Sequence, residues 1–416
     1  MSNKLFFVLI NLLSYCMYLL PILLVTGPFL PDLLISICSV IFLIICFVRN
    51  DWRYFNNIFF KVFIIFYCYI VVRSLFYSLD FSEIRSIIFY IRFGVFSIFI
   101  YFLCNLNKEF TKNFTRVIFF LIIFLIFDAF IQYHFGYDII GIKKYSVDRI
   151  SGVFGSDAKL GSYISRLFPI SLVYFFLYNN KKNNIFDAKY FLFLILVFLG
   201  ILITGERTAL FLFLLSVLLI FIINKNFLKN IFLYFATFVL IFFIFTKFDS
   251  DLNQRMVVHT KSQLNISGEK IKIFSNDHQN HYLIAYKMFQ DNILFGQGPT
   301  SFRHMCSKDK FKLENNLGCT THPHNIYIQS LAEIGLVGFS FLSFCFIFVY
   351  FNIIKNILSN YNQKLSNNNF HIHILLVTIS LSLFPLAPTG NLFNNWMSII
   401  FYIPIGFFLN EYFKSK

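Results

Sequence analysis

Long apolar runs follow one another along most of this chain. Most contain about 18–22 residues, which is enough for an α-helix to cross the hydrocarbon of a bilayer. They do not alternate between apolar and polar positions, as the strands of a membrane β-barrel would. The sequence therefore predicts an all-α polytopic membrane protein with about twelve transmembrane helices, at about residues 5–26, 30–48, 58–78, 86–104, 116–134, 161–178, 190–204, 208–223, 230–247, 324–352, 371–387 and 395–412.

Polar residues are concentrated in one long segment, at about residues 249–323, between the ninth and tenth runs. Within it, residues 278–291 place Tyr282, Ala285 and Met288 on one side of a helix. We therefore expect an amphipathic helix here, of the kind that can lie on a membrane surface. The chain divides accordingly into a membrane part at 1–248, a large loop at 249–323 and a second membrane part at 324–416.

Composition and charge agree with this division and orient it. With 58% hydrophobic and 13% charged residues, the chain is not an ordinary soluble domain. If the N-terminus lies in the cytoplasm, the inner connections carry most of the Lys and Arg, whereas the short outer connections carry only Arg85 and Arg207. This asymmetry follows the positive-inside rule, so we expect cytoplasmic termini and a large loop on the opposite side. The net charge of +15 then sets orientation and does not indicate nucleic-acid binding.

Cysteine placement predicts one disulfide. Six of the eight cysteines lie in or beside the apolar runs, and only Cys306 and Cys319 lie in the large loop. A loop outside the cytoplasm is an oxidising environment, so we expect these two to be bonded. The chain has no CxxC or HExxH motif, and His322 and His324 are spaced poorly for a shared metal on a helix. We predict neither a metal nor a cofactor.

The polar residues with potential chemistry gather at the outer face. His322 and Pro323 precede the tenth run, which His324 and Asn325 open, and Pro323 suits the first turn of a helix. A helix that included both histidines would place them about 200° apart, at about 100° per residue, so they would not face one site. The alternative is that these residues only cap the helix or sit at the interface.

Two arginines lie in other outer connections. Arg207 begins the eighth run, where a helix N-terminus and a guanidinium together favour an anion, although Arg207 could instead pair with a carboxylate such as Glu206. Arg149 lies in a glycine-bearing loop and could hold a phosphate through paired hydrogen bonds.

These motifs together resemble the bacterial O-antigen ligase/polymerase superfamily, over about residues 125–400. The resemblance rests on His324-Asn325 followed by Gln329, Glu333, Gly335 and Gly338, and on the turns Gly205-Glu206-Arg207-Thr208 and Gly296-Gln297-Gly298. It implies a metal-independent glycosyltransferase of the inner membrane, which takes a glycan from undecaprenyl diphosphate in the periplasm and transfers it to an acceptor. It also implies that His324 is catalytic and that Arg207 is the first of two arginines that hold the diphosphate.

The second arginine of the family is missing from its usual place on the amphipathic helix, where this chain has His281. Arg303, Arg255 or His281 could take its role, while Asn325, Glu333, His322 and Arg149 would support the site. The resemblance implies an O-antigen ligase with lipid A–core as acceptor or, as the alternative, a polymerase that joins lipid-linked repeat units. Transfer to protein is a third possibility. A transporter is less favoured, because it would show paired halves and broken helices near the midplane.

Overall fold

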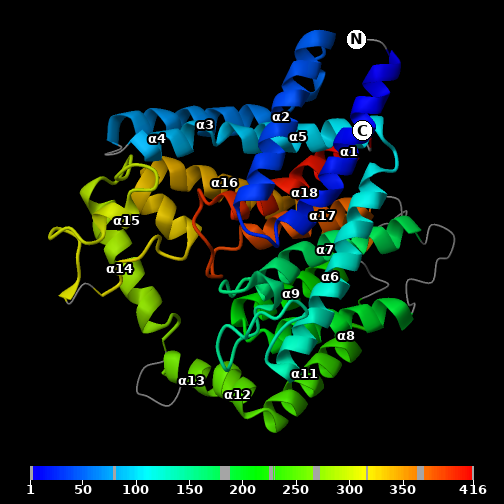
Figure 1. Cartoon of the computed structure of the whole chain (residues 1–416). Coiled ribbons are helices and arrows are strands. Elements are labelled where there is room, and N and C mark those ends of the chain that lie inside the picture. The colour runs from blue at the N-terminus through cyan, green and yellow to red at the C-terminus, as the bar shows by residue number, and fades with distance from the viewer. Residues whose placement is uncertain are drawn as a thin grey trace.

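The computed structural model describes residues 3–77, 81–178, 188–223, 228, 230–265, 272–314, 317–362 and 370–414. Helices make up most of this part of the chain (Figure 1). Each predicted apolar run corresponds to a helix. These helices are α1 (Asn3–Leu23), α2 (Phe29–Arg49), α3 (Ile58–Tyr77), α5 (Ile91–Leu106), α6 (Phe110–Phe135), α7 (Leu160–Tyr178), α8 (Ala188–Ile203), α9 (Arg207–Ile223), α11 (Ile231–Phe248), α16 (Ile326–Asn362), α17 (Phe370–Ser382) and α18 (Asn395–Lys414).

Eight helices of the described part are long and apolar enough to cross a membrane, and one of these spans joins α4 (Phe81–Ile88) to α5. The expected polytopic helical membrane protein is therefore confirmed. Within the described residues, the apolar helices α8, α9 and α17 are shorter, and α17 ends at Ser382 rather than near 387. Pro385 and Pro388 follow this end, and proline cannot donate to a continuing helix.

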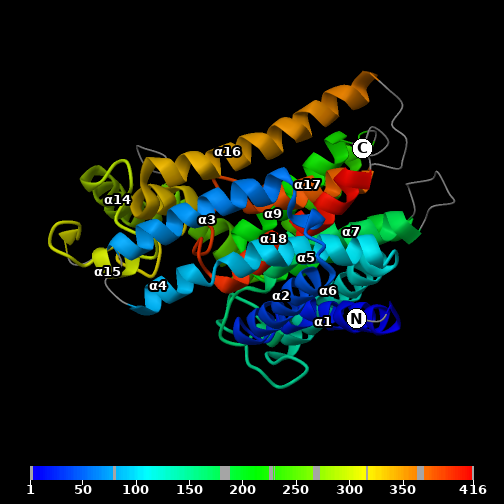
Figure 2. The same ribbon diagram turned by 90° about the horizontal axis from the view of Figure 1, so that it is seen from above.

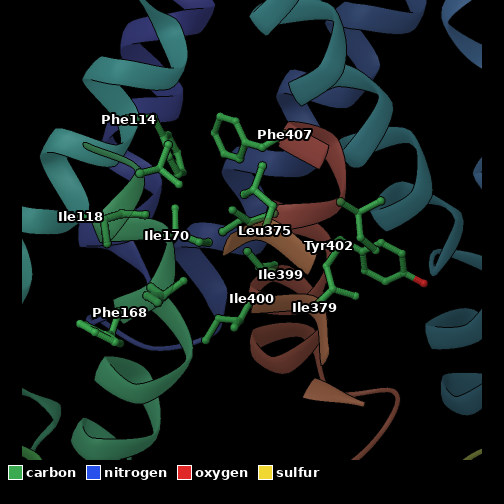
Figure 3. Close-up of a cluster of buried hydrophobic side chains, with 14 of the residues drawn as sticks. Phe114, Ile118, Phe168, Ile170, Leu375, Ile379, Ile399, Ile400, Tyr402 and Phe407 are labelled. Atoms are coloured by element: carbon green, nitrogen blue, oxygen red, sulfur yellow. The ribbon is translucent and has the colours of Figure 1, made fainter. Parts of the chain in front are cut away.

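The core lies where α5, α6, α7, α17 and α18 meet. In Figure 3, Phe114 and Ile118 of α6 and Phe168 of α7 lie on one side of the cluster, with Leu375 of α17 and Phe407 of α18 among the side chains opposite. All five are almost inaccessible to solvent. Gaps between facing side chains would forfeit many dispersion contacts, so this dense packing holds the bundle together.

Short helices build the large loop after α11. They are α12 (Ser250–Asn253), the π-helix η3 (Gln254–Val258), α13 (His259–Gln263), α14 (Asn276–Asp291) and α15 (Phe302–Met305). The predicted amphipathic helix is α14, whose first turn is capped by the Ser275 side chain. Its apolar side packs in a protein cluster with Phe302, Phe311 and Ala332. The buried part of this side of α14 therefore packs on the protein, while Leu283 and Tyr286 stay exposed.

Helix α16 lies beside α3 at the edge of the bundle and is kinked near its N-terminal end (Figure 2). Gly335 has φ 64° and ψ −165°, a backbone conformation that only glycine adopts readily. The carbonyls of Ile293 and Leu294 accept hydrogen bonds from Leu336 N and Val337 N, which the kink would otherwise leave unpaired. A Cβ at Gly335 would lie 2.4 Å from Leu294 O, so the turn after α14 and the kink interlock.

Candidate active site

The loop before α16 carries the predicted histidines. A disulfide joins Cys306 to Cys319, whose Cα atoms are 5.1 Å apart. His324 then adopts φ 57°, in the left-handed region, and its carbonyl accepts a 2.8 Å hydrogen bond from Thr389 N. The bond between the cysteines thus closes the loop that leads into this segment.

The expectation that Pro323 lies in the first turn of this helix is wrong. Helix α16 begins at Ile326, and Asn325 Oδ1 accepts hydrogen bonds from Tyr327 N (2.9 Å) and Ile328 N (3.1 Å). Asn325 therefore acts as the N-cap of α16. Its amide nitrogen donates to Pro385 O at 2.7 Å, so it orients the helix end rather than the His324 ring.

Four histidines converge at this point. The ring centroids of His322 and His324 are 4.2 Å apart, and those of His281 and His278 on α14 lie 5.3 and 5.9 Å from His324. The expectation that His322 and His324 face different directions is therefore wrong, because both precede the helix. The sequence pattern did not identify His278 as a site residue. Its position three residues before His281 nevertheless places it on the same side of an amphipathic helix.

Burial favours the neutral imidazole at His322 and His324. Burial, together with His322, His281 and His278, which disfavour a further positive charge, lowers the pKa of His324 to about 4. Burial also lowers the pKa of His322 to about 4. His281 Nδ1 lies 2.8 Å from Gly318 O, and because a carbonyl only accepts, this nitrogen carries the proton. At neutral pH, His324 is therefore a proton acceptor.

Three arginines form a second group nearby. Arg207 donates to Thr260 Oγ1 of α13 at 3.1 Å and experiences the positive charges of Arg255 and Arg149. Burial and Arg149 both lower the pKa of Arg255, whereas Asp148, 3.8 Å away, raises it. Arg149 Nε is buried and has no hydrogen-bond partner in the described part of the chain. A cluster of this kind has spare donors and excess positive charge for an anion.

Glu206 does not pair with Arg207, as the alternative interpretation required. Its two carboxylate oxygens accept hydrogen bonds from Gly161 N (2.8 Å) and Ser162 N (2.9 Å), at the start of α7. A carboxylate at this position satisfies free N–H groups of a helix N-terminus. Glu206 therefore anchors the turn that carries Arg207 and leaves the guanidinium available.

Glu333, which we expected to support the site, holds a neighbouring turn. Its carboxylate is fully buried and accepts hydrogen bonds from Thr300 N (3.1 Å), Phe302 N (3.0 Å) and the Gln329 side chain (2.9 Å). These bonds fix the turn that carries Arg303. Arg303 itself is exposed and acts electrostatically on His322, so it lies beside the histidines rather than in the group around Arg207.

The arginine group lies within electrostatic range of the histidines, because burial and His281 lower the pKa of His278 and the positive charge of Arg207 lowers it further. Among the described residues, His, Cys, Asp and Glu nowhere form a group of three or more that could hold a metal ion.

Residues 192–343 match the family model described as O-antigen ligase. This match supports the O-antigen ligase/polymerase superfamily for the chain. The matched stretch contains Arg207, Arg255, both histidines of α14 and His324, and so includes most of the site described above. Enzymes of the O-antigen ligase class are glycosyltransferase-like and act on lipid-linked glycans in a membrane. No curated protein matches the chain.

Proposed function

We propose that the chain transfers a glycan from undecaprenyl diphosphate to the hydroxyl of an acceptor at the periplasmic face of the bacterial inner membrane. Residues 1–248 and 324–416 would span the membrane, with both termini in the cytoplasm, and 249–323 would lie in the periplasm. The observation that carries the proposal is the buried histidine His324 in a group of four histidines, within electrostatic range of an arginine group in which Arg149 Nε has no partner among the described residues.

In the proposed reaction, the acceptor oxygen forms a bond to the anomeric carbon of the donor sugar, and the bond from that carbon to the diphosphate breaks. His324 takes the hydroxyl proton, and the diphosphate leaves with the electron pair. A pKa of about 4 makes His324 a weak base in the free protein. The anionic diphosphate would raise this pKa when bound, bringing the base closer to the working pH.

The arginines would stabilise the charge that develops on the leaving diphosphate. Arg207 and Arg255 come from α9 and η3 and lie together, with Arg149 beside them. Arg255 would thus take the role of the family's second arginine, whose usual position on α14 is occupied by His281. Arg303 and His281 would lie beside the other histidines. Preorganised donors in a water-poor site lower the barrier because they need not reorient during the reaction.

Transfer by the purified protein from a lipid-diphosphate glycan tests this proposal. His324→Ala should abolish transfer while donor binding persists, and transfer should survive EDTA. Reversible loss of transfer on chelation would contradict the metal-free step. The acceptor can be identified from a deletion strain. Loss of all long chains with accumulated lipid-linked polymer indicates a ligase, whereas core plus one repeat indicates a polymerase.

A further inference from the structure

A large cavity lies among α3, α16, α17 and α18. Its volume is about 600 Å³, and its walls are mainly apolar, with Phe66, Phe341, Cys345 and Leu376 among them. Polar groups lie at its two ends, including Thr389 and Asn391 at one and Lys355 and Asn356 at the other. An apolar interior of this size within membrane helices suits a hydrocarbon chain.

The cavity is too long for the acyl chain of a single leaflet. Its lining on α18 runs from Met397 to Phe413, which at 1.5 Å per residue is about 24 Å. On α16 it runs from Phe341 to Asn356, or about 22 Å. Half the hydrocarbon thickness is only about 15 Å, so an occupant that fills the cavity passes the midplane of the membrane.

The length of the cavity favours one kind of chain. Each acyl chain of a lipid A molecule ends within its own leaflet. A polyprenyl chain is a single chain that is longer than one leaflet, so it can extend along the whole cavity.

The outer end of the cavity adjoins the histidine loop. Thr389 lines the cavity, donates its backbone N–H to His324 O, and accepts a hydrogen bond from Ile326 N at its hydroxyl. The arginines come from α9, η3 and the turn at Arg149, none of which lines the cavity. In Figure 1, α3 and α16 lie in the upper part of the protein, and α12 and α13 lie below. The donor diphosphate and the cavity would thus reach His324 from different elements.

We propose that this cavity holds the polyprenyl chain of the acceptor lipid, an assignment that rests on the proposed glycan transfer. The acceptor is then a second lipid-linked glycan, and the reaction is a polymerase reaction, not transfer to the lipid A–core that the resemblance placed first. The acceptor hydroxyl lies at the Thr389 end, next to His324, while the chain extends between α16 and α18.

Photocrosslinking to the full-length protein in nanodiscs tests the site directly. The probe is a benzophenone-bearing long-chain polyprenol without a phosphate, so that the arginines contribute nothing to its capture. We expect crosslinks on cavity-lining peptides of α16 and α18, and competition by long-chain polyprenol but not by farnesol or lipid A. Crosslinks elsewhere, or equal competition by lipid A, would overturn the assignment.

A matched pair of substitutions on α16 adds a second measurement. Cys345→Trp fills the cavity, whereas Ile347→Trp adds the same side chain on the exposed face of the helix. Cys345→Trp should weaken capture at least tenfold, because displacing about two methylenes from an apolar site costs about that factor. Ile347→Trp should change it less than twofold, and equal effects would count against the site. If Cys345→Trp does not fold, the crosslink map of the wild type still decides.

The transfer assay separates this inference from the proposed function. With the same donor, Cys345→Trp should raise KM for a long-chain acceptor and leave KM for the donor unchanged. Transfer by the wild type with no dependence on acceptor chain length would refute the cavity assignment alone. Polyprenol capture at the cavity without any glycan transfer would refute the proposed function instead.

Discussion

Arg73 on α3 donates a 2.7 Å hydrogen bond from Nη2 to the carbonyl oxygen of Gly296, in the turn after α14. Its Nε donates to Phe295 O at 3.1 Å, and the Tyr69 hydroxyl, one turn away, donates to Ile334 O at 2.6 Å. The buried Arg73 side chain thus joins a membrane helix to the turn that interlocks with the α16 kink. It holds the N-terminal part of α16, which follows the histidine loop, in a fixed position.

We expect Arg73→Met to destabilise the protein by about 2–4 kcal/mol. Hydrogen bonds from a charged donor are each worth roughly 1.5–3 kcal/mol, and the two carbonyls would lose their partner. Thermal unfolding in detergent measures the effect. The exposed Arg85, changed to Met, serves as the control and should leave Tm nearly unchanged. Equal Tm values for the two variants would show that the link to Gly296 carries little energy.

Gly335→Ala should also be strongly destabilising. The Gly335 backbone conformation costs other residues about 1–3 kcal/mol, and the new Cβ would collide with the Leu294 carbonyl. Leu336→Ala, at the next position, removes only an exposed side chain and provides the comparison. We expect a lower Tm and reduced transfer for Gly335→Ala alone. A Gly335→Ala variant with the Tm of the Leu336→Ala protein would contradict the interlocked turn.

The helices were predictable because membrane helices leave long apolar runs in a sequence, and the twelve runs each contain one. The start of α16 could not be predicted in the same way. Pro323 suits the first turn of a helix, but the Asn325 cap and the left-handed backbone of His324 depend on contacts with Thr389. The role of Glu333 was equally hidden. Its partners at Thr300 and Phe302 lie more than thirty residues away and are backbone groups, which carry no sequence signal.

The disulfide between Cys306 and Cys319 should add about 3 kcal/mol in the chain-entropy model of a loop of this length. Replacing both cysteines with serine should therefore lower Tm, and the two single variants should resemble the double variant. Maleimide labelling after denaturation without reductant should modify the six free cysteines, and all eight only after reduction. Labelling of Cys306 and Cys319 before reduction would refute the bond.

The arginine group predicts a ranking of variants. Arg207→Ala should abolish transfer, and Arg207→Lys should lose most of it, since a point charge does not replace the paired donors of a guanidinium. Arg255→Ala should weaken donor binding about tenfold to hundredfold, as expected for a lost charge-assisted hydrogen bond. Titration of each variant with the donor, followed by binding and by transfer, measures these effects. Arg303→Ala is the control, because Arg303 is exposed and lies by His322. A larger effect of Arg303→Ala than of Arg255→Ala would reverse the assignment of the second arginine.

The closeness of His322 to His324 predicts a pH effect. A general base acts only when neutral, so kcat/KM falls as the pH drops through the pKa of the base in the free enzyme. Burial and the neighbouring histidines lower the pKa of His324 to about 4, which places the acidic limb of the wild-type profile near that pH. His322→Ala admits water to the cluster and removes one competing positive charge. The pKa of His324 should then rise toward its ordinary value of about 6.5.

We therefore expect the acidic limb of His322→Ala to move to higher pH, by about one unit or more, with substantial transfer retained at pH 8. His322→Phe keeps the site more closed than alanine and should shift the limb less, since most of the lowering comes from burial. His324→Ala should be inactive across the whole pH range. Rate–pH profiles of kcat/KM for the three variants measure this. If the limb stays at the same pH in His322→Ala, or if His324→Ala retains a limb of its own, then another group accepts the hydroxyl proton.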